Sequence, residues 1–204
     1  MTTTETPALP RKAIQGTAGG LFLMTLFTMM WAGVANAGLD GRDDHLVFIL
    51  FAMICLIFLA YGVRLFMAAK KFPAVTTEED RLEGKKMGKR FGIIFGIEGT
   101  AIPIACVILG VTHHDQYIVS AIALIVGLHF YPMASIFKRK IDYYIATWTC
   151  LTALISIFLI ASGQPQSFTM PLLGIGVGLA TTTYGVYMIV VGAAMITQRS
   201  SVRE

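Results

Sequence analysis

Hydrophobic and polar positions divide this chain into long blocks, and they do not form the stripes of an amphipathic surface helix. A helix that crosses a membrane needs about 20 consecutive, mostly apolar residues. Blocks of that length predict six spans, at approximately 14–37, 46–69, 91–111, 117–137, 143–162 and 170–196. The pattern therefore predicts an all-α integral membrane protein. Its transmembrane domain is expected to be 14–196, with a loop at 70–90 and short tails at 1–13 and 197–204.

Composition supports a membrane environment. Of the 204 residues, 55% are hydrophobic and only 14% are charged, whereas soluble domains carry about 25% charged residues. The formal net charge is +4, and the basic residues flank the apolar blocks. This placement favours anionic lipid headgroups over nucleic acid as the partner of the basic residues. The three cysteines, Cys55, Cys106 and Cys150, fall inside apolar blocks without a C-x-x-C spacing and predict neither disulfide nor metal site.

Lysine and arginine positions predict the orientation. With six spans, 15 of the 16 basic residues fall on one side of the membrane, and Arg42 stands alone on the other. Because cytoplasmic loops are enriched in Lys and Arg, both termini are expected in the cytoplasm, most plausibly at a bacterial inner membrane. One alternative remains for the N-terminus. Arg11 and Lys12, the following apolar run and Ala35-Asn36-Ala37 resemble a secretory signal with its cleavage site, which would leave five spans.

Three tyrosines mark a weak internal similarity. "YGVRLF" begins at Tyr61, "YPMASIF" at Tyr131 and "YGVYMI" at Tyr184, each near the basic end of an even-numbered span. The similarity suggests three tandem helical hairpins. The alternative is that tyrosines have simply accumulated at membrane interfaces.

Small residues recur at a spacing of four in the first, third and sixth spans, at Gly16 and Gly20, Gly92 and Gly96, and Gly174 and Gly178. Such faces let two helix backbones approach closely. Contact within one chain is the preferred interpretation, and a homo-oligomer interface is the alternative. Pro103 and Pro132 lie within the third and fourth spans, where each removes a backbone donor and favours a kink.

The most unusual residue is Glu98, inside the third span. Eight residues separate it from Arg90 and nine separate His129 from Lys138, so both lie about 12 to 14 Å from the same side at 1.5 Å per residue. A carboxylate at that depth costs a few kcal/mol, and it is expected to face the bundle interior and a partner. The available partners are His129, Tyr61 and Arg64. Glu98 is either protonated and hydrogen-bonded, or ionised beside His129 or Arg64. If it titrates at physiological pH, Glu98 and His129 form a natural proton-handling pair.

Other polar side chains are expected near the same depth. Tyr61 and Trp148 fall in that layer, and Arg64 and Tyr131 lie just below it. The candidates for proton handling or transport are therefore Glu98, His129, Tyr61 and Arg64, whereas Trp148 is expected to serve packing or an interface. The competing interpretation is that Glu98 and His129 only lock two helices together and that Arg64 extends to the interface.

The loops give weaker signals. The outer turns hold Asp and His residues at 40–45 and 113–115, but their spacing matches no known class of metal site, and no metal is predicted. In the inner loop, Thr76 or Thr77 followed by acidic residues predicts a short interfacial helix leading into the third span. No glycine-rich phosphate loop is present, and no cofactor is predicted.

The sequence supports two functions about equally. The first is small-solute or proton-linked transport that uses Glu98 and His129, and it predicts a cavity at their depth. The second is a structural or stress-related membrane protein without transport, which predicts a sealed core. An intramembrane enzyme is less favoured because the chain has no H-E-x-x-H motif and no serine with an evident base.

Overall fold

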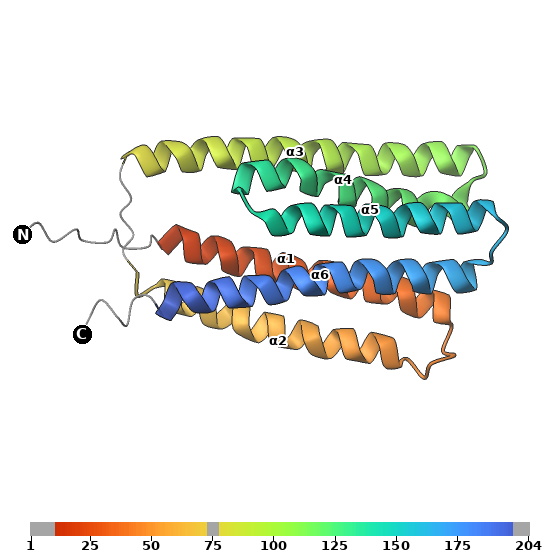
Figure 1. The fold of residues 1–204 in the computed structure, drawn as a ribbon, viewed down its shortest axis with the longest axis horizontal. Coiled ribbons are helices and arrows are strands. Elements are labelled where there is room, and N and C mark those ends of the chain that lie inside the picture. Colours follow the sequence, from red (N-terminus) through yellow and green to blue (C-terminus); the bar gives the residue numbers. More distant parts are fainter. Residues whose placement is uncertain (1–10, 73–77, 198–204) are drawn as a thin grey trace, which may run out of the picture.

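The computed structural model describes residues 11–72 and 78–197, which form a bundle of long helices (Figure 1). The elements are α1 (Arg11–Leu39), α2 (Leu46–Ala69), α3 (Glu78–Val111), a 3₁₀ turn η1 (Asp115–Tyr117), α4 (Ile118–Phe137), α5 (Lys140–Ala161) and α6 (Gln166–Thr197). Within these two ranges, six helices are long and apolar enough to cross a membrane, and no strand is present. The prediction of an all-α fold with six spans is confirmed.

The observed helices are longer than the predicted spans at several ends. α3 runs without a break from Glu78 through the predicted third span, so the expected interfacial helix is continuous with that span. Thr76 and Thr77, the expected caps, lie outside the described residues. Helix α1 extends through Ala35-Asn36-Ala37, and Ala35 is fully buried.

Arg42 stabilises the turn between α1 and α2. Its guanidinium donates hydrogen bonds to the carbonyls of Gly38 and Leu39 at 2.7 and 2.8 Å, and to the carbonyl of Ser167 in α6 at 2.5 Å. The last carbonyls of a helix have no partner within the helix, so a basic side chain placed there satisfies them. This local role gives a structural reason for a single basic residue at that end of the bundle.

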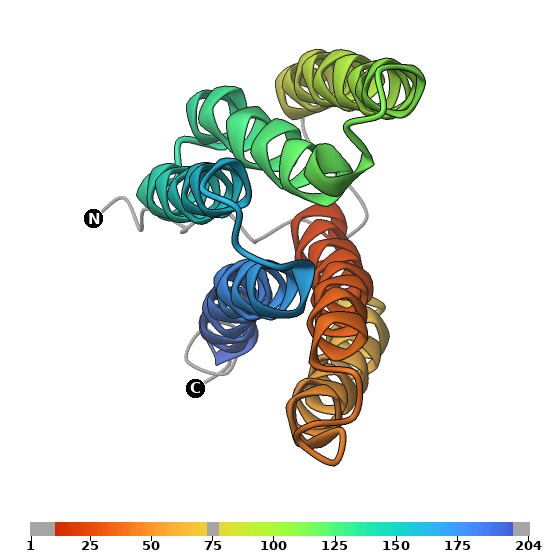
Figure 2. The same ribbon diagram turned by 90° about the vertical axis from the view of Figure 1, so that its right-hand side faces the viewer.

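Helices α1 and α6 form the centre of the bundle. α2 packs against both, α5 packs against α6, α4 against α5, and α3 lies outermost on α4 (Figure 2). The end at which α1, α3 and α5 begin and α2, α4 and α6 end carries most of the Lys and Arg residues, and we call it the basic end. Because α3 has α4 as its main neighbour, it is the least enclosed helix.

The glycines of α6 explain how closely the central helices approach. A Cβ built on Gly174 would collide with the backbone of α1 at Trp31 and Ala35, and one built on Gly178 would lie 2.9 Å from the Phe51 ring of α2. A Cβ built on Gly185 would likewise collide with the ring of Phe58. Small residues at these positions therefore set the distances between helices.

The other predicted small-residue pairs lie in different surroundings. A Cβ built on Gly20 would collide with Met188, but one built on Gly16, Gly92 or Gly96 would meet no atom within 4 Å. Gly92 and Gly96 therefore make no close helix contact within the described chain. A role for them between copies of the chain stays a prediction.

The three tyrosines of the suggested repeat have different environments. Tyr184 is buried in the core, Tyr61 is half-buried, and Tyr131 is exposed. The glycines of the two Tyr-Gly pairs do share a role, because Gly62 receives the Phe22 ring just as Gly185 receives that of Phe58. Packing of an aromatic ring against a helix backbone is therefore common to the two Tyr-Gly segments, and the tandem repeat stays a prediction.

Candidate functional site

Glu98 of α3 and His129 of α4 lie against each other. Glu98 Oε1 is 3.4 Å from His129 Nδ1, and both side chains are more than nine-tenths buried. Among the described residues, neither Glu98 Oε2 nor His129 Nδ1 has a hydrogen-bond partner. The structure thus brings together the two residues whose depths match in the sequence, in a close contact that lacks good hydrogen-bond geometry.

Aromatic rings fix the imidazole of His129. The Phe130 ring stacks on it with centroids 4.3 Å apart, and the Phe95 ring of α3 lies at 5.6 Å. Packing on both sides limits the orientations that the His129 ring can adopt, so Nδ1 is held toward Glu98.

Tyr61 and Arg64 do not join this pair. Both lie on α2, which packs against α1 and α6, so that α1 separates them from α3 (Figure 2). Arg64 is exposed, and its guanidinium carbon lies 5.8 Å from the centroid of the Tyr61 ring. Tyr61 and Arg64 are therefore not neighbours of Glu98, because a similar depth in the membrane does not make two helices neighbours.

Trp148 and Tyr131 also lie outside the pair. The indole N–H of Trp148 donates to the carbonyl of Gly176 at 2.8 Å and so joins α5 to α6. The Tyr131 hydroxyl and Thr147 Oγ1 are 3.0 Å apart, which joins α4 to α5. Both aromatic side chains are partly exposed on the outside of the bundle and contribute to helix packing.

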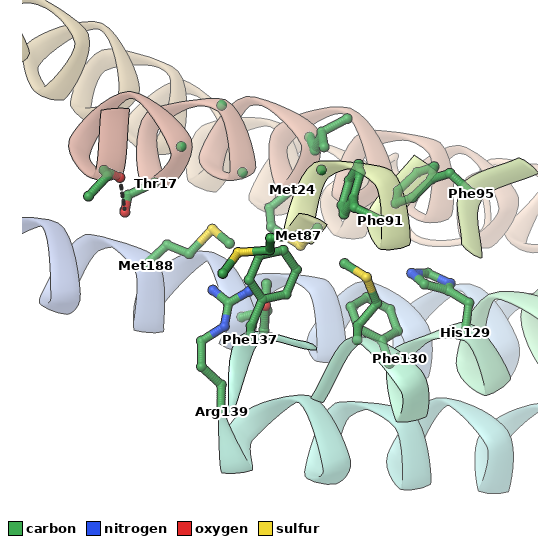
Figure 3. A pocket seen from close by; sticks show the side chains of 18 of the residues that line it. Thr17, Met24, Met87, Phe91, Phe95, His129, Phe130, Phe137, Arg139 and Met188 are labelled. Atoms are coloured by element: carbon green, nitrogen blue, oxygen red, sulfur yellow. Dashed lines mark hydrogen bonds between the residues drawn. The ribbon is translucent and has the colours of Figure 1, made fainter. Parts of the chain in front are cut away.

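A cavity of about 580 Å³ lies between α1, α3, α4 and α6, and His129 is part of its wall. Figure 3 shows His129 toward one end of the cavity and Arg139 toward the basic end, with methionine and phenylalanine side chains between them. Lys12 of α1 also lines the basic end. The pair is therefore not sealed in a packed core, because its histidine borders a space large enough for a small molecule.

Arg139 precedes α5 at the basic end of the cavity. Its guanidinium carbon is 4.3 Å from the centroid of the Phe137 ring and 5.7 Å from that of Tyr184. Its Nε is 3.4 Å from Oδ2 of Asp142, which is fully buried. Sequence analysis missed this cluster, although the spacing of three residues between Arg139 and Asp142 at a helix start could have indicated it.

Two buried hydroxyl pairs were also missed. Thr28 Oγ1 donates to Thr181 Oγ1 at 2.8 Å between α1 and α6, and the Ser120 and Ser156 hydroxyls are 2.9 Å apart between α4 and α5. They show how this bundle joins helices with neutral polar groups. Glu98 differs because it is an ionisable side chain in contact with a histidine that lines a cavity.

The outer turns give no cluster of metal ligands. Across residues 11–72 and 78–197, no group of three or more His, Cys, Asp and Glu side chains converges in a way that could hold a metal ion. His45, one of the candidates weighed in the sequence, has its Nδ1 2.7 Å from Asn36 Oδ1, a contact within the turn region.

Comparisons with protein-family models, curated proteins and solved structures found no match for this chain. The class to which it belongs therefore follows from its own fold and composition. Six apolar helices make it a multi-pass membrane protein. Its distinguishing site is a cavity between helices that is bordered by one member of a buried Glu–His pair.

Proposed function

We propose that this protein transports a small solute across a bacterial inner membrane and that Glu98 and His129 link the transport to protons. The observation that supports the proposal most directly is the cavity, whose wall includes His129 in contact with Glu98. A purely structural pair predicts a sealed core at this depth, whereas a transport site needs a space that solute and water can enter.

Proton movement follows from the geometry of the pair. The imidazole borders the cavity, and its Nδ1 faces a carboxyl oxygen at 3.4 Å. Histidine and a carboxyl group both exchange protons readily, so a proton taken from the cavity by His129 can pass to Glu98. The charge state of the pair then changes the attraction between α3 and α4 at this buried polar contact.

Helix α3 is suited to respond to that change. Among its described side chains, Glu98 is the only buried one, and the others are half-buried or exposed. Gly84 and Gly88 of α3 face the cavity opposite Gly16 and Gly20 of α1. In the proposed cycle, α3 moves toward α1 and closes the cavity, because small residues on both helices permit a close approach.

The orientation is part of the proposal. The positive-inside rule places the basic end, and with it both termini, in the cytoplasm. The cavity then faces the cytoplasmic half of the membrane. The Lys and Arg residues at 81–90, together with Lys138 and Lys140, contact anionic lipid headgroups. Three tandem hairpins, α1–α2, α3–α4 and α5–α6, remain the proposed origin of the six helices.

Transport is tested in proteoliposomes that contain the pH-sensitive dye pyranine. Small organic acids, amines and sugars are added one at a time, and the dye reports proton entry that depends on the added solute. We expect at least one solute to drive proton movement with wild-type protein and not with Glu98→Gln, while Arg64→Gln behaves as wild type. If no solute distinguishes wild-type from protein-free liposomes, the proposal is wrong.

One observation favours the structural alternative. Because Glu98 is the only buried described side chain of α3, its contact with His129 anchors that helix. On this view, Glu98→Gln retains a hydrogen-bonding group, preserves the fold and changes nothing in a transport assay. Thermal unfolding of wild type, Glu98→Gln and Glu98→Leu in detergent separates the two views. Loss of proton movement in a Glu98→Gln protein of normal stability supports transport.

A further inference from the structure

We infer that the cavity binds an amphipathic anion, a molecule with an elongated apolar body and one negatively charged head. The body lies among the methionine and phenylalanine side chains, and the head lies at the basic end against Arg139 and Lys12. This inference names the substrate class of the proposed transport and rests on the same cavity. Binding is nevertheless measurable whether or not transport occurs.

The cavity wall between its two ends suits an apolar body. Met24, Phe91, Phe130, Met133 and Met188 line it together with glycines of α1 and α3 (Figure 3). Its volume of about 580 Å³ is within the usual range of roughly 300 to 1,000 Å³ for small-molecule sites. Methionine side chains are flexible and adapt to ligands of irregular shape, and phenylalanines supply flat apolar contact.

Cationic groups mark one end only. Lys12 and Arg139 line the basic end, and none of the described lining residues is Asp or Glu. Asp142 lies 3.4 Å from Nε of Arg139. The contact with Asp142 runs through Nε, and the Arg139 side chain remains 27% exposed, which leaves its two terminal nitrogens accessible. Those nitrogens are available for the paired hydrogen bonds that a guanidinium makes with carboxylate or phosphate.

The packing of Arg139 orients it for this role. Its guanidinium lies over the Phe137 ring and near the Tyr184 ring, and Figure 3 shows it extending from the start of α5 toward the cavity. Partial neutralisation by Asp142 holds the side chain in place, and Lys12 supplies the second positive charge. An anion at this position therefore meets an excess of positive charge.

The end of the cavity at His129 limits the length of the ligand's apolar body and the polarity of its terminus. His129 is eight residues before Phe137 on α4, so the cavity extends about 12 Å along that helix. Across this distance, the described wall offers few polar groups. His129 is more than nine-tenths buried there, and its Nδ1 has no hydrogen-bond partner among the described residues. The far end accepts an apolar terminus or one polar atom, but not a second charged group.

Two sources supply such a ligand. A soluble organic acid with an apolar body enters from the aqueous side, and an anionic lipid enters from the bilayer beside the loosely packed α3. Both share the chemistry inferred here, an anionic head joined to an apolar chain, and the experiment distinguishes them.

Calorimetric titration of purified protein in neutral detergent tests the charge requirement. Decanoate, decanol and decyltrimethylammonium have the same chain with a negative, neutral and positive head, and each is used below its micelle concentration. We expect decanoate to bind at least about tenfold more tightly than the other two, because only its head pairs with Arg139 and Lys12. Equal binding of all three would overturn the inference.

Matched glycine variants test the location. Gly88 lines the cavity and Gly99 does not, and a Cβ built on either meets no atom within 4 Å. Gly88→Leu fills the cavity and is expected to abolish decanoate binding, whereas Gly99→Leu is expected to bind as wild type. Lys12→Gln should weaken binding without disturbing the Arg139–Asp142 pair, with Arg64→Gln as its control. Binding that survives Gly88→Leu places the ligand elsewhere and overturns the inference.

The lipid source is tested by native mass spectrometry of protein reconstituted with phosphatidylglycerol and then returned to detergent. Retention of this lipid by wild type and Gly99→Leu, but not by Gly88→Leu, identifies the ligand as an anionic lipid. Selective decanoate binding without retained lipid identifies a soluble amphipathic acid. If folded wild-type protein neither binds decanoate selectively nor retains phosphatidylglycerol, the inference is overturned. Selective binding of the anion without proton movement would reject the proposed transport and leave the inferred binding site intact.

Discussion

At the scale of single residues, Glu98 is a carboxyl group that is more than nine-tenths buried within an apolar part of α3. A carboxyl group at the centre of a membrane costs about 2.5 to 3.5 kcal/mol on insertion scales. His129 at 3.4 Å offsets part of that cost. The hydroxyl pairs Thr28–Thr181 and Ser120–Ser156 join helices with neutral groups. A structural link between α3 and α4 did not require a carboxylate, which is why we assign Glu98 a chemical role.

The Thr28–Thr181 pair gives a prediction for a purely structural contact. Its hydroxyls are 2.8 Å apart and buried between α1 and α6. We expect a double-mutant cycle of Thr28→Val and Thr181→Val to give a coupling of about 0.6 kcal/mol, the average for such bonds in membrane bundles. Unfolding in mixed micelles with increasing SDS measures it. A coupling indistinguishable from zero would show that this bond does not stabilise the bundle.

At the scale of helices, the structure agrees with the predictions that rest on the lengths of the hydrophobic blocks and on the positions of the basic residues. Block length predicts six spans, and distance from the basic residues predicts the common depth of Glu98 and His129. Tyr61 shares that depth and Arg64 lies just below it, but both lie on α2, beyond α1. Hydrophobic blocks give a residue's position along the membrane normal. Which helices become neighbours depends on side-chain packing that block patterns do not contain.

Other parts of the site could not be predicted from the sequence, because they also depend on how the helices pack. The cavity arises because α3 packs loosely beside α1, and no local pattern describes a space between helices. The buried Asp142 resembled an ordinary acidic residue in a first helical turn, and only the fold places it beside Arg139. Gly174 and Gly96 likewise belong to glycine pairs with the same spacing, but Gly174 packs against the α1 backbone and Gly96 has no atom within 4 Å of its Cβ position.

These two glycines give a prediction about helix packing. At Gly174 a larger side chain collides with the α1 backbone, whereas Gly96 faces no atom within 4 Å. We expect Gly174→Leu to lose at least about 1 to 3 kcal/mol of stability through overpacking, and Gly96→Leu to leave the monomer unchanged. Thermal unfolding followed by tryptophan fluorescence measures both. Equal stability of the two variants would contradict the close approach of α1 and α6.

At the scale of the whole molecule, five of the six helices contribute buried residues to one core, and α3 lies outside it. Helices α1, α2 and α6 share a core containing Leu21, Phe58 and Tyr184. Helices α4 and α5 contribute Phe130 and Ile145 to the same core. Helix α3 lies on the outer side of α4 (Figure 1), and its residues form one wall of the cavity. A weakly held helix over a cavity is the arrangement that opening and closing require.

Cysteine accessibility tests the cavity and the orientation together. Met133 lines the cavity, and Leu128 is exposed on the outside of α4. With Cys55, Cys106 and Cys150 replaced by alanine, we expect Met133→Cys to react with a membrane-impermeant maleimide in inverted vesicles but not in intact cells. Leu128→Cys should be protected in both, because lipid covers it. Labelling of Met133→Cys only from the outside would reverse the proposed orientation.

The central claim is that the Glu98–His129 pair exchanges protons with solvent through the cavity. Difference infrared spectroscopy over a pH series measures this directly, with Asp142→Asn as the control for the other buried carboxyl group. The account predicts a carboxyl band that changes with pH in wild type and in Asp142→Asn and is missing from Glu98→Gln. A Glu98 band that stays constant across the whole pH range would contradict the account and make the pair a sealed structural link.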